Sequence, residues 1–138
     1  MVINERRTAM TKTLEMQFTP ELVAEIKDFG YDATQDPRKI PSSRGWLGMI
    51  GGPKYRPDIL VQQGDKFVLV ETKVGPVLLG SVIKARNYAD HYNAGVVLCV
   101  PDESLIRTPQ SVKEFAQDNH IILCSKSEIE ETLEEIFN

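Results

Sequence analysis

Residues 58–73 read Asp-Ile-Leu-Val-Gln-Gln-Gly-Asp-Lys-Phe-Val-Leu-Val-Glu-Thr-Lys, and this stretch decides the fold. Two runs rich in Ile, Leu, Val and Phe, residues 58–62 and 67–73, have the composition of β-strands. The link between them contains Gly64-Asp65, a pair that favours a tight turn between antiparallel strands. The stretch therefore predicts a β-hairpin.

This hairpin brings two carboxylates together. In a hairpin centred between Gly64 and Asp65, the numbers of facing residues sum to 129, so Asp58 faces Glu71 with Cβ atoms about 4.5–5.5 Å apart. Two like charges at that spacing repel each other, and burial among apolar neighbours strengthens the repulsion. A divalent cation such as Mg²⁺, with Mn²⁺ as a substitute, would turn the repulsion into a binding site, because hard cations prefer carboxylate oxygens.

A lysine completes the set of reactive groups. Lys73 lies two residues after Glu71, so the period of a strand places both side chains on one face. A lysine beside two carboxylates and a metal ion can orient a water molecule and stabilise negative charge on a phosphorane-like transition state. Thr72 points to the other face, but its backbone carbonyl is a candidate metal ligand. Together these groups indicate hydrolysis of a phosphodiester bond.

The rest of the chain predicts an α/β domain around this hairpin. A helix is expected from Pro20 to Phe29, with Thr19 as its N-cap, whereas residues 1–18 show no sustained period and are predicted to form a flexible or oligomerising arm. The further predicted elements are a strand at 31–34, a helix at 81–92, a buried strand at 94–100, a helix at 110–118, a strand at 121–124 and a helix that begins at Ser127 with a capping box to Glu130. The order α-β-β-β-α-β-α-β-α predicts a mixed sheet with helices on both faces, in a single domain over residues 1–138.

The motif residues resemble a known family. Pro57-Asp58, twelve intervening residues and then Glu71-Thr72-Lys73 are similar to the PD-(D/E)XK motif of restriction-endonuclease-like nucleases. The resemblance covers about residues 20–101, and it implies an α-β-β-β-α-β core to which this chain adds a C-terminal helix-strand-helix. By this resemblance Asp58 and Glu71 are metal ligands and Lys73 is the catalytic lysine.

The resemblance also implies a helix carboxylate, a substrate and an assembly. In such nucleases an acidic residue on the first helix completes the site, and Glu25 fits this position because it borders the apolar stripe of the predicted helix. Glu21 is the alternative, because archaeal Holliday-junction resolvases of the superfamily place this glutamate near the start of the helix. The implied activity is Mg²⁺-dependent cleavage of DNA, duplex or branched, by a homodimer that leaves a 5′-phosphate.

One segment has the charge to contact nucleic acid. No acidic residue lies between Asp36 and Asp58, and the basic residues of this segment are Arg38, Lys39, Arg44, Lys54 and Arg56. These five are candidates for phosphate contacts, and Trp46 is a candidate for stacking on a base. The alternatives are that the basic residues form a solvated loop and that Trp46 closes the core or a dimer interface.

The overall composition limits the function and the location of the chain. The 138 residues carry a net charge of −4, which argues against indiscriminate binding of nucleic acid. This acidity favours the alternative function, a non-catalytic module of the same fold that binds nucleic acid or protein. Cys99 and Cys124 lie in apolar runs without metal-ligand spacing, and no apolar run approaches eighteen residues. A cytoplasmic location without membrane attachment is therefore expected.

Overall fold

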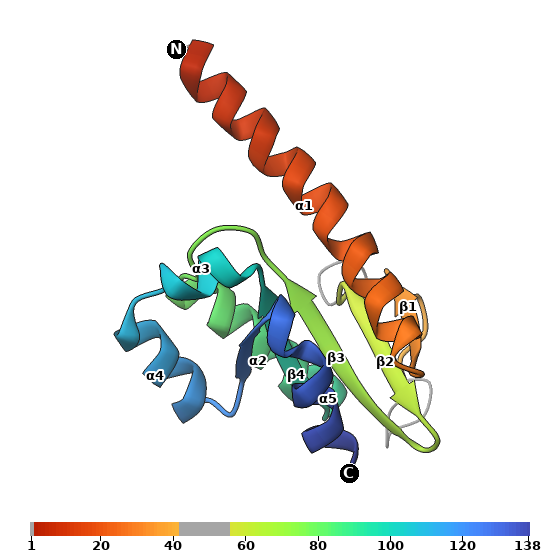
Figure 1. The fold of residues 1–138 in the computed structure, drawn as a ribbon. Helices are drawn as coiled ribbons and strands as arrows, with labels where there is room; N and C mark the ends of the chain where they lie inside the picture. The colour runs from red at the N-terminus through yellow and green to blue at the C-terminus, as the bar shows by residue number, and fades with distance from the viewer. Residues whose placement is uncertain (1, 42–55) are drawn as a thin grey trace.

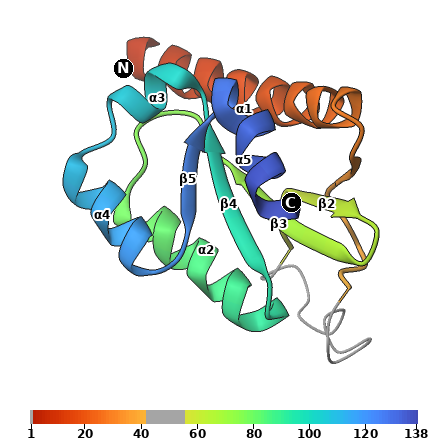
Figure 2. The ribbon, with the colours of Figure 1, turned by 60° about the horizontal axis from the view of Figure 1, so that its bottom comes forward.

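The computed structural model describes residues 2–41 and 56–138 of the chain. Its elements are α1 (Val2–Asp28), β1 (Asp32–Gln35), β2 (Ile59–Gln63), β3 (Lys66–Thr72), α2 (Leu79–Tyr92), β4 (Gly95–Val100), α3 (Asp102–Ile106), α4 (Gln110–Asp118), β5 (Ile122–Ser125), the 3₁₀ turn η3 (Lys126–Glu128) and α5 (Ile129–Phe137). The strands form one five-stranded sheet in the order β1-β2-β3-β4-β5 (Figures 1 and 2). The first three strands pair antiparallel, and β3, β4 and β5 pair parallel. The predicted class, a mixed sheet flanked by helices, is confirmed.

The sheet separates two apolar layers, because successive side chains of a strand point to opposite faces. On β3, Val68 and Val70 pack in the layer that contains the buried residues of α1 and α5. Leu69, between them, packs with the buried residues of α2 and α4 in the opposite layer. The same alternation assigns Glu71 to the α2 face of the sheet, directly after an apolar run.

The predicted hairpin has the predicted register. Ile59 pairs with Val70 and Val61 with Val68, so the paired numbers sum to 129. Gly64 has a φ of +61° in the turn, a conformation that glycine adopts at little cost. Asp58, the residue before β2, therefore lies opposite Glu71 across the hairpin.

The first helix differs from the prediction, because it begins at Val2 and contains Pro20 in its interior. Proline removes the N–H that would bond to the carbonyl of Met16, and its ring crowds that carbonyl, at a cost of about 3 kcal/mol. The preceding residues include many good helix formers, such as Glu, Arg, Ala, Met and Lys. Thr19 does not cap a helix, and its hydroxyl bonds to β3 instead. No helix in the described part of the chain is long and apolar enough to span a membrane.

Two details near the C-terminus also differ. The short helix α3 was not predicted, and it directly follows β4. The capping box joins Ser125 to Glu128 rather than Ser127 to Glu130, with the Ser125 hydroxyl and Glu128 Oε1 2.7 Å apart. Ser127 lies inside η3, and its N–H donates to Asp102 Oδ1 on α3 at 3.1 Å, so this N–H is not left for Glu130. The contact with the unpredicted helix therefore takes one of the two bonds that the predicted capping box requires.

Candidate active site

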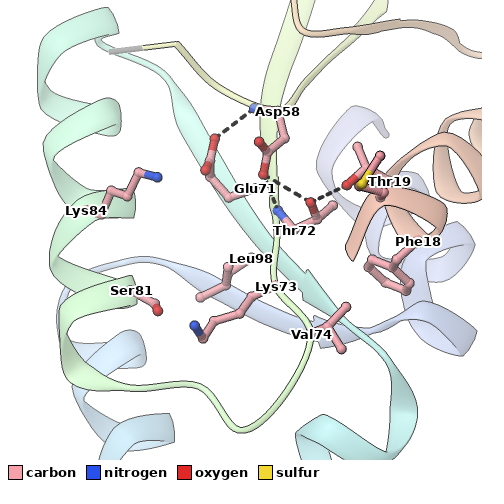
Figure 3. Close-up of a pocket in the computed structure, with 11 residues that line it drawn as sticks. Phe18, Thr19, Asp58, Glu71, Thr72, Lys73, Val74, Ser81, Lys84 and Leu98 are labelled. Carbon is pink, nitrogen blue, oxygen red and sulfur yellow. Dashed lines mark hydrogen bonds between the residues drawn. The ribbon is translucent and has the colours of Figure 1, made fainter. Parts of the chain in front are cut away.

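A cavity of about 580 Å³ lies at the carboxyl end of β3, between α1 and α2. Asp58, Glu71, Thr72 and Lys73 of the predicted site line this cavity, together with residues of both helices (Figure 3). Four of the sequence-predicted site residues therefore meet in one place. The antiparallel pairing of β2 with β3 brings Asp58 to this end of the sheet, although Glu71 lies 13 positions later in the sequence.

Each carboxylate is fixed by a backbone donor of the other strand. The N–H of Asp58 donates to Glu71 Oε1 at 2.9 Å. In return, Asp58 Oδ2 accepts the N–H of Thr72 at 2.8 Å and the Thr72 hydroxyl at 3.0 Å. These bonds orient both carboxylates (Figure 3), and hydrogen bonds to charged acceptors are among the stronger ones in proteins. The site is therefore preorganised by the hairpin itself.

The electrostatics of the pair are unfavourable for two negative charges. Glu71 is only 5% exposed, and burial together with the charge of Asp58 raises its pKa to about 8. The N–H of Asp58 and the charge of Lys84 lower this pKa again, but they do not offset the burial. The two carboxylates also contribute, after burial, to raising the pKa of Tyr88 to about 12. Neutralisation of Glu71, by a proton or by a cation, therefore relieves the repulsion within this pair.

Two lysines line the same cavity. Lys84 extends from α2 toward Glu71, and Lys73 extends from the end of β3 toward Ser81 (Figure 3). The Lys84 ammonium lies 5.7 Å from the centre of the Tyr88 ring. Within the described residues, neither lysine forms an ion pair with a carboxylate. Both ammonium groups are thus available to an anion that enters the cavity.

The donor set suits a hard divalent cation. Asp58 and Glu71 each use one oxygen for a backbone N–H, and the second oxygen of each accepts no N–H in the described part of the chain. Within these same residues no group of three or more metal-ligating side chains is found. Mg²⁺ fits such a pair, because it keeps several waters and binds through one or two carboxylates, whereas Ca²⁺ takes 6–8 oxygen ligands.

The structure does not bring the predicted helix carboxylate to the cavity. Glu25 lies on α1 with its Oε2 3.3 Å from the ammonium of Lys126, and Glu21 Oε2 lies 3.6 Å from the same ammonium. Neither glutamate lines the cavity. Three residues of α1 line it, Met16, Phe18 and Thr19, and the Thr19 hydroxyl lies 2.6 Å from that of Thr72. The sequence carried one signal for this contact, because Thr72 was expected on the face of the sheet opposite Glu71.

The basic segment is only partly described. Arg44, Trp46 and Lys54 lie outside the described residues. Arg38 and Lys39 are exposed, and the guanidinium of Arg56 pairs with Asp36 at 2.9 Å. The predicted nucleic-acid contacts of this segment stay predictions.

Comparison with known proteins gives little. No protein-family model matches the chain, and no curated protein matches it. Among solved structures, one match is SfsA from Pyrococcus furiosus in complex with Ca²⁺, with a TM-score of 0.38 and 11% sequence identity. The match covers 89% of this chain and 56% of SfsA, so the chain spans little more than half the length of that protein.

Proposed function

We propose that this protein is a Mg²⁺-dependent nuclease that hydrolyses phosphodiester bonds in DNA, with Asp58 and Glu71 as the metal ligands. The observation that supports this function is the convergence of these two carboxylates in one cavity, where Glu71 is buried and its pKa is raised to about 8. A buried pair of like charges destabilises the folded state, and a bound cation would offset the repulsion between them. The resemblance of Asp58, Glu71 and Lys73 to the PD-(D/E)XK motif points to the same activity.

The chain would supply positioning and charge for this reaction. A bound Mg²⁺ supplies Lewis-acid polarisation of the phosphate and of the attacking water. Lys73 orients the water and donates to the phosphate oxygens on which charge builds up in the transition state. Two carboxylates, two lysines and one divalent cation give the cavity a net charge of about +2, which suits a phosphodiester anion. The backbone carbonyl of Thr72 is proposed as a further oxygen ligand.

Binding of the DNA would extend beyond the cavity. We assign phosphate contacts to the exposed Arg38 and Lys39 and to Arg56. Arg44 and Lys54 are proposed to contact phosphates as well, and Trp46 is proposed to stack on a base. A homodimer is part of the proposal, because one such cavity attacks one strand at a time. The carboxylates on α1 are left out of the catalytic set, because Lys126 binds both of them.

Metal titration together with a cleavage panel tests this function. Calorimetry with Mg²⁺ and Mn²⁺ should show binding that Asp58→Asn abolishes, whereas Asp65→Asn, on the exposed turn of the same hairpin, should bind as the wild type does. The wild type should cut at least one substrate among linear duplex, single strand, flap and four-way junction, each offered as DNA and as RNA. A wild-type protein that binds neither metal and cuts no substrate would contradict the proposal and favour a non-catalytic binding module.

A further inference from the structure

A chain of two hydroxyl groups connects α1 to Asp58. Thr19 Oγ1 lies 2.6 Å from Thr72 Oγ1, and Thr72 Oγ1 lies 3.0 Å from Asp58 Oδ2. Figure 3 shows these contacts as one continuous line from the helix to the carboxylate. Hydrogen bonds therefore link α1, the end of β3 and the residue before β2.

The chemistry of the three groups fixes the direction of this chain. An ionised carboxylate only accepts hydrogen bonds, and a threonine hydroxyl has a single proton to donate. The Thr72 hydroxyl gives its proton to Asp58, so the 2.6 Å contact is made with the proton of Thr19. Thr72 donates a stronger bond to Asp58 because it accepts one from Thr19, since successive hydrogen bonds polarise one another.

The position of Thr19 is itself fixed by the core. The neighbouring residues of α1 that face the sheet are buried: Phe18 is 7% exposed, and Leu22 and Ile26 are fully buried. The helix therefore cannot rotate Thr19 away without disturbing the packing against β3. A hydroxyl on a rigid helix is already held in the position from which it donates. The same group on a loop would lose conformational entropy when it became ordered.

We propose that Thr19 is a positioning residue for the metal ligand Asp58, and that it is the contribution of α1 to the site. This inference rests on the proposed function, because it treats Asp58 as a ligand. The donated bonds hold Oδ2 against Thr72 and so fix the orientation in which the other oxygen of Asp58 is presented to a cation. Groups that orient a ligand in this way typically change metal affinity by about 10–100-fold when they are removed.

The test replaces Thr19 with a side chain of the same shape and no donor. Thr19→Val should weaken Mn²⁺ binding, measured by calorimetry, by about 10–100-fold, and Thr19→Ser should restore it. Cleavage by Thr19→Val should need more Mn²⁺ but reach the wild-type rate at saturation, because Thr19 acts on the ligand and not on the substrate. Thr34→Val, an exposed threonine on β1, is the matched control and should bind Mn²⁺ normally.

A double-mutant cycle excludes a general effect on folding. If Thr19 acts through the Thr72 hydroxyl, Thr19→Val should have no further effect on Mn²⁺ affinity in a Thr72→Val background. Wild-type affinity in Thr19→Val, failure of Thr19→Ser to restore binding, or additive losses in the double variant would each overturn the inference. A wild-type protein that binds no metal would instead contradict the proposed function and remove the positioning role with it.

Discussion

Two pairs of neighbouring carboxylates in the described part of the chain, one on α1 and one at the end of the hairpin, have different partners. Glu21 and Glu25 stand one turn apart on α1, and the ammonium of Lys126 lies within 3.6 Å and 3.3 Å of one oxygen of each. Asp58 and Glu71 stand at the end of the hairpin, where backbone N–H groups fix them but no lysine of the described chain pairs with them.

This difference is the basis on which we propose the hairpin pair, and not the pair on α1, as the cation site. The pair on α1 is partly exposed and lies against the ammonium of Lys126, although Glu25 Oε2 is buried without a hydrogen-bond partner among the described residues. The hairpin pair contains a buried glutamate whose pKa is raised to about 8 by burial and by Asp58. A lysine lies between the carboxylates of α1, whereas the more buried hairpin pair has no ion-pair partner within the described residues.

The largest effect that separates the two pairs is expected in metal binding. Glu71→Gln should lower Mn²⁺ affinity by more than about 100-fold, beyond the loss typical of an outer-shell change, and should abolish cleavage. Glu25→Gln should leave both unchanged, because its carboxylate lies against Lys126. Calorimetry and a plasmid-nicking assay measure both variants. Equal losses of metal affinity in the two variants would contradict this prediction and would show that Glu25 of α1 contributes to the metal site.

The next effect concerns the lysine of the motif. Lys73→Ala should reduce the cleavage rate by about 10²–10³-fold, as is typical when a donor that stabilises transition-state charge is removed. Its affinity for Mn²⁺ should not fall, because the lysine is a cation and not a ligand. Single-turnover cleavage at saturating Mn²⁺ separates these two quantities, and Lys27→Ala on the exposed surface of α1 is the control. A variant with wild-type cleavage would exclude Lys73 from the reaction.

The pH dependence of stability gives a smaller effect, which needs no substrate. The folded protein keeps a proton on Glu71 that the unfolded chain releases above about pH 4.5, because the pKa rises from 4.5 to about 8 on folding. The free energy of unfolding in EDTA should therefore fall as the pH rises from about 4.5 to about 8. At about 1.4 kcal/mol for each pKa unit, the rise from 4.5 to about 8 corresponds to a loss on the order of 5 kcal/mol.

Glu71→Gln should remove this dependence, and Mn²⁺ should remove it in the wild type. Urea unfolding at several pH values measures the slope, with Glu114→Gln on the surface of α4 as the variant that should keep it. An equal slope in the wild type and in Glu71→Gln would mean that Glu71 does not cause the pH dependence of stability.

The hairpin and its register were predictable from the sequence because they depend on local rules. Turn chemistry at Gly64 centres the hairpin, and the strand period then fixes that Asp58 faces Glu71. These rules need no knowledge of the rest of the fold. The site residues within 58–73 could therefore be predicted from the sequence.

The contribution of α1 was not predictable in the same way. The start of the helix was assigned to Pro20 because proline is favoured at the first helical position, but Pro20 lies inside a longer helix. Glu25 borders an apolar stripe, yet that edge faces Lys126 of η3, which lies about 100 residues later in the chain. Only tertiary packing decides which side chain of a helix reaches a given strand, and here that side chain is Thr19.

The smallest expected effect on stability concerns the carboxylate pair on α1. Lys126→Ala removes the cation between Glu21 and Glu25, whose side chains are 62% and 42% exposed. Solvent screening of such pairs limits the expected loss of stability to about 1 kcal/mol or less, and Mn²⁺ affinity should not change. Chemical denaturation and calorimetry measure these two quantities. A loss of Mn²⁺ affinity in Lys126→Ala would show that the two carboxylate pairs are coupled through α1, and the contrast between them would no longer identify the site.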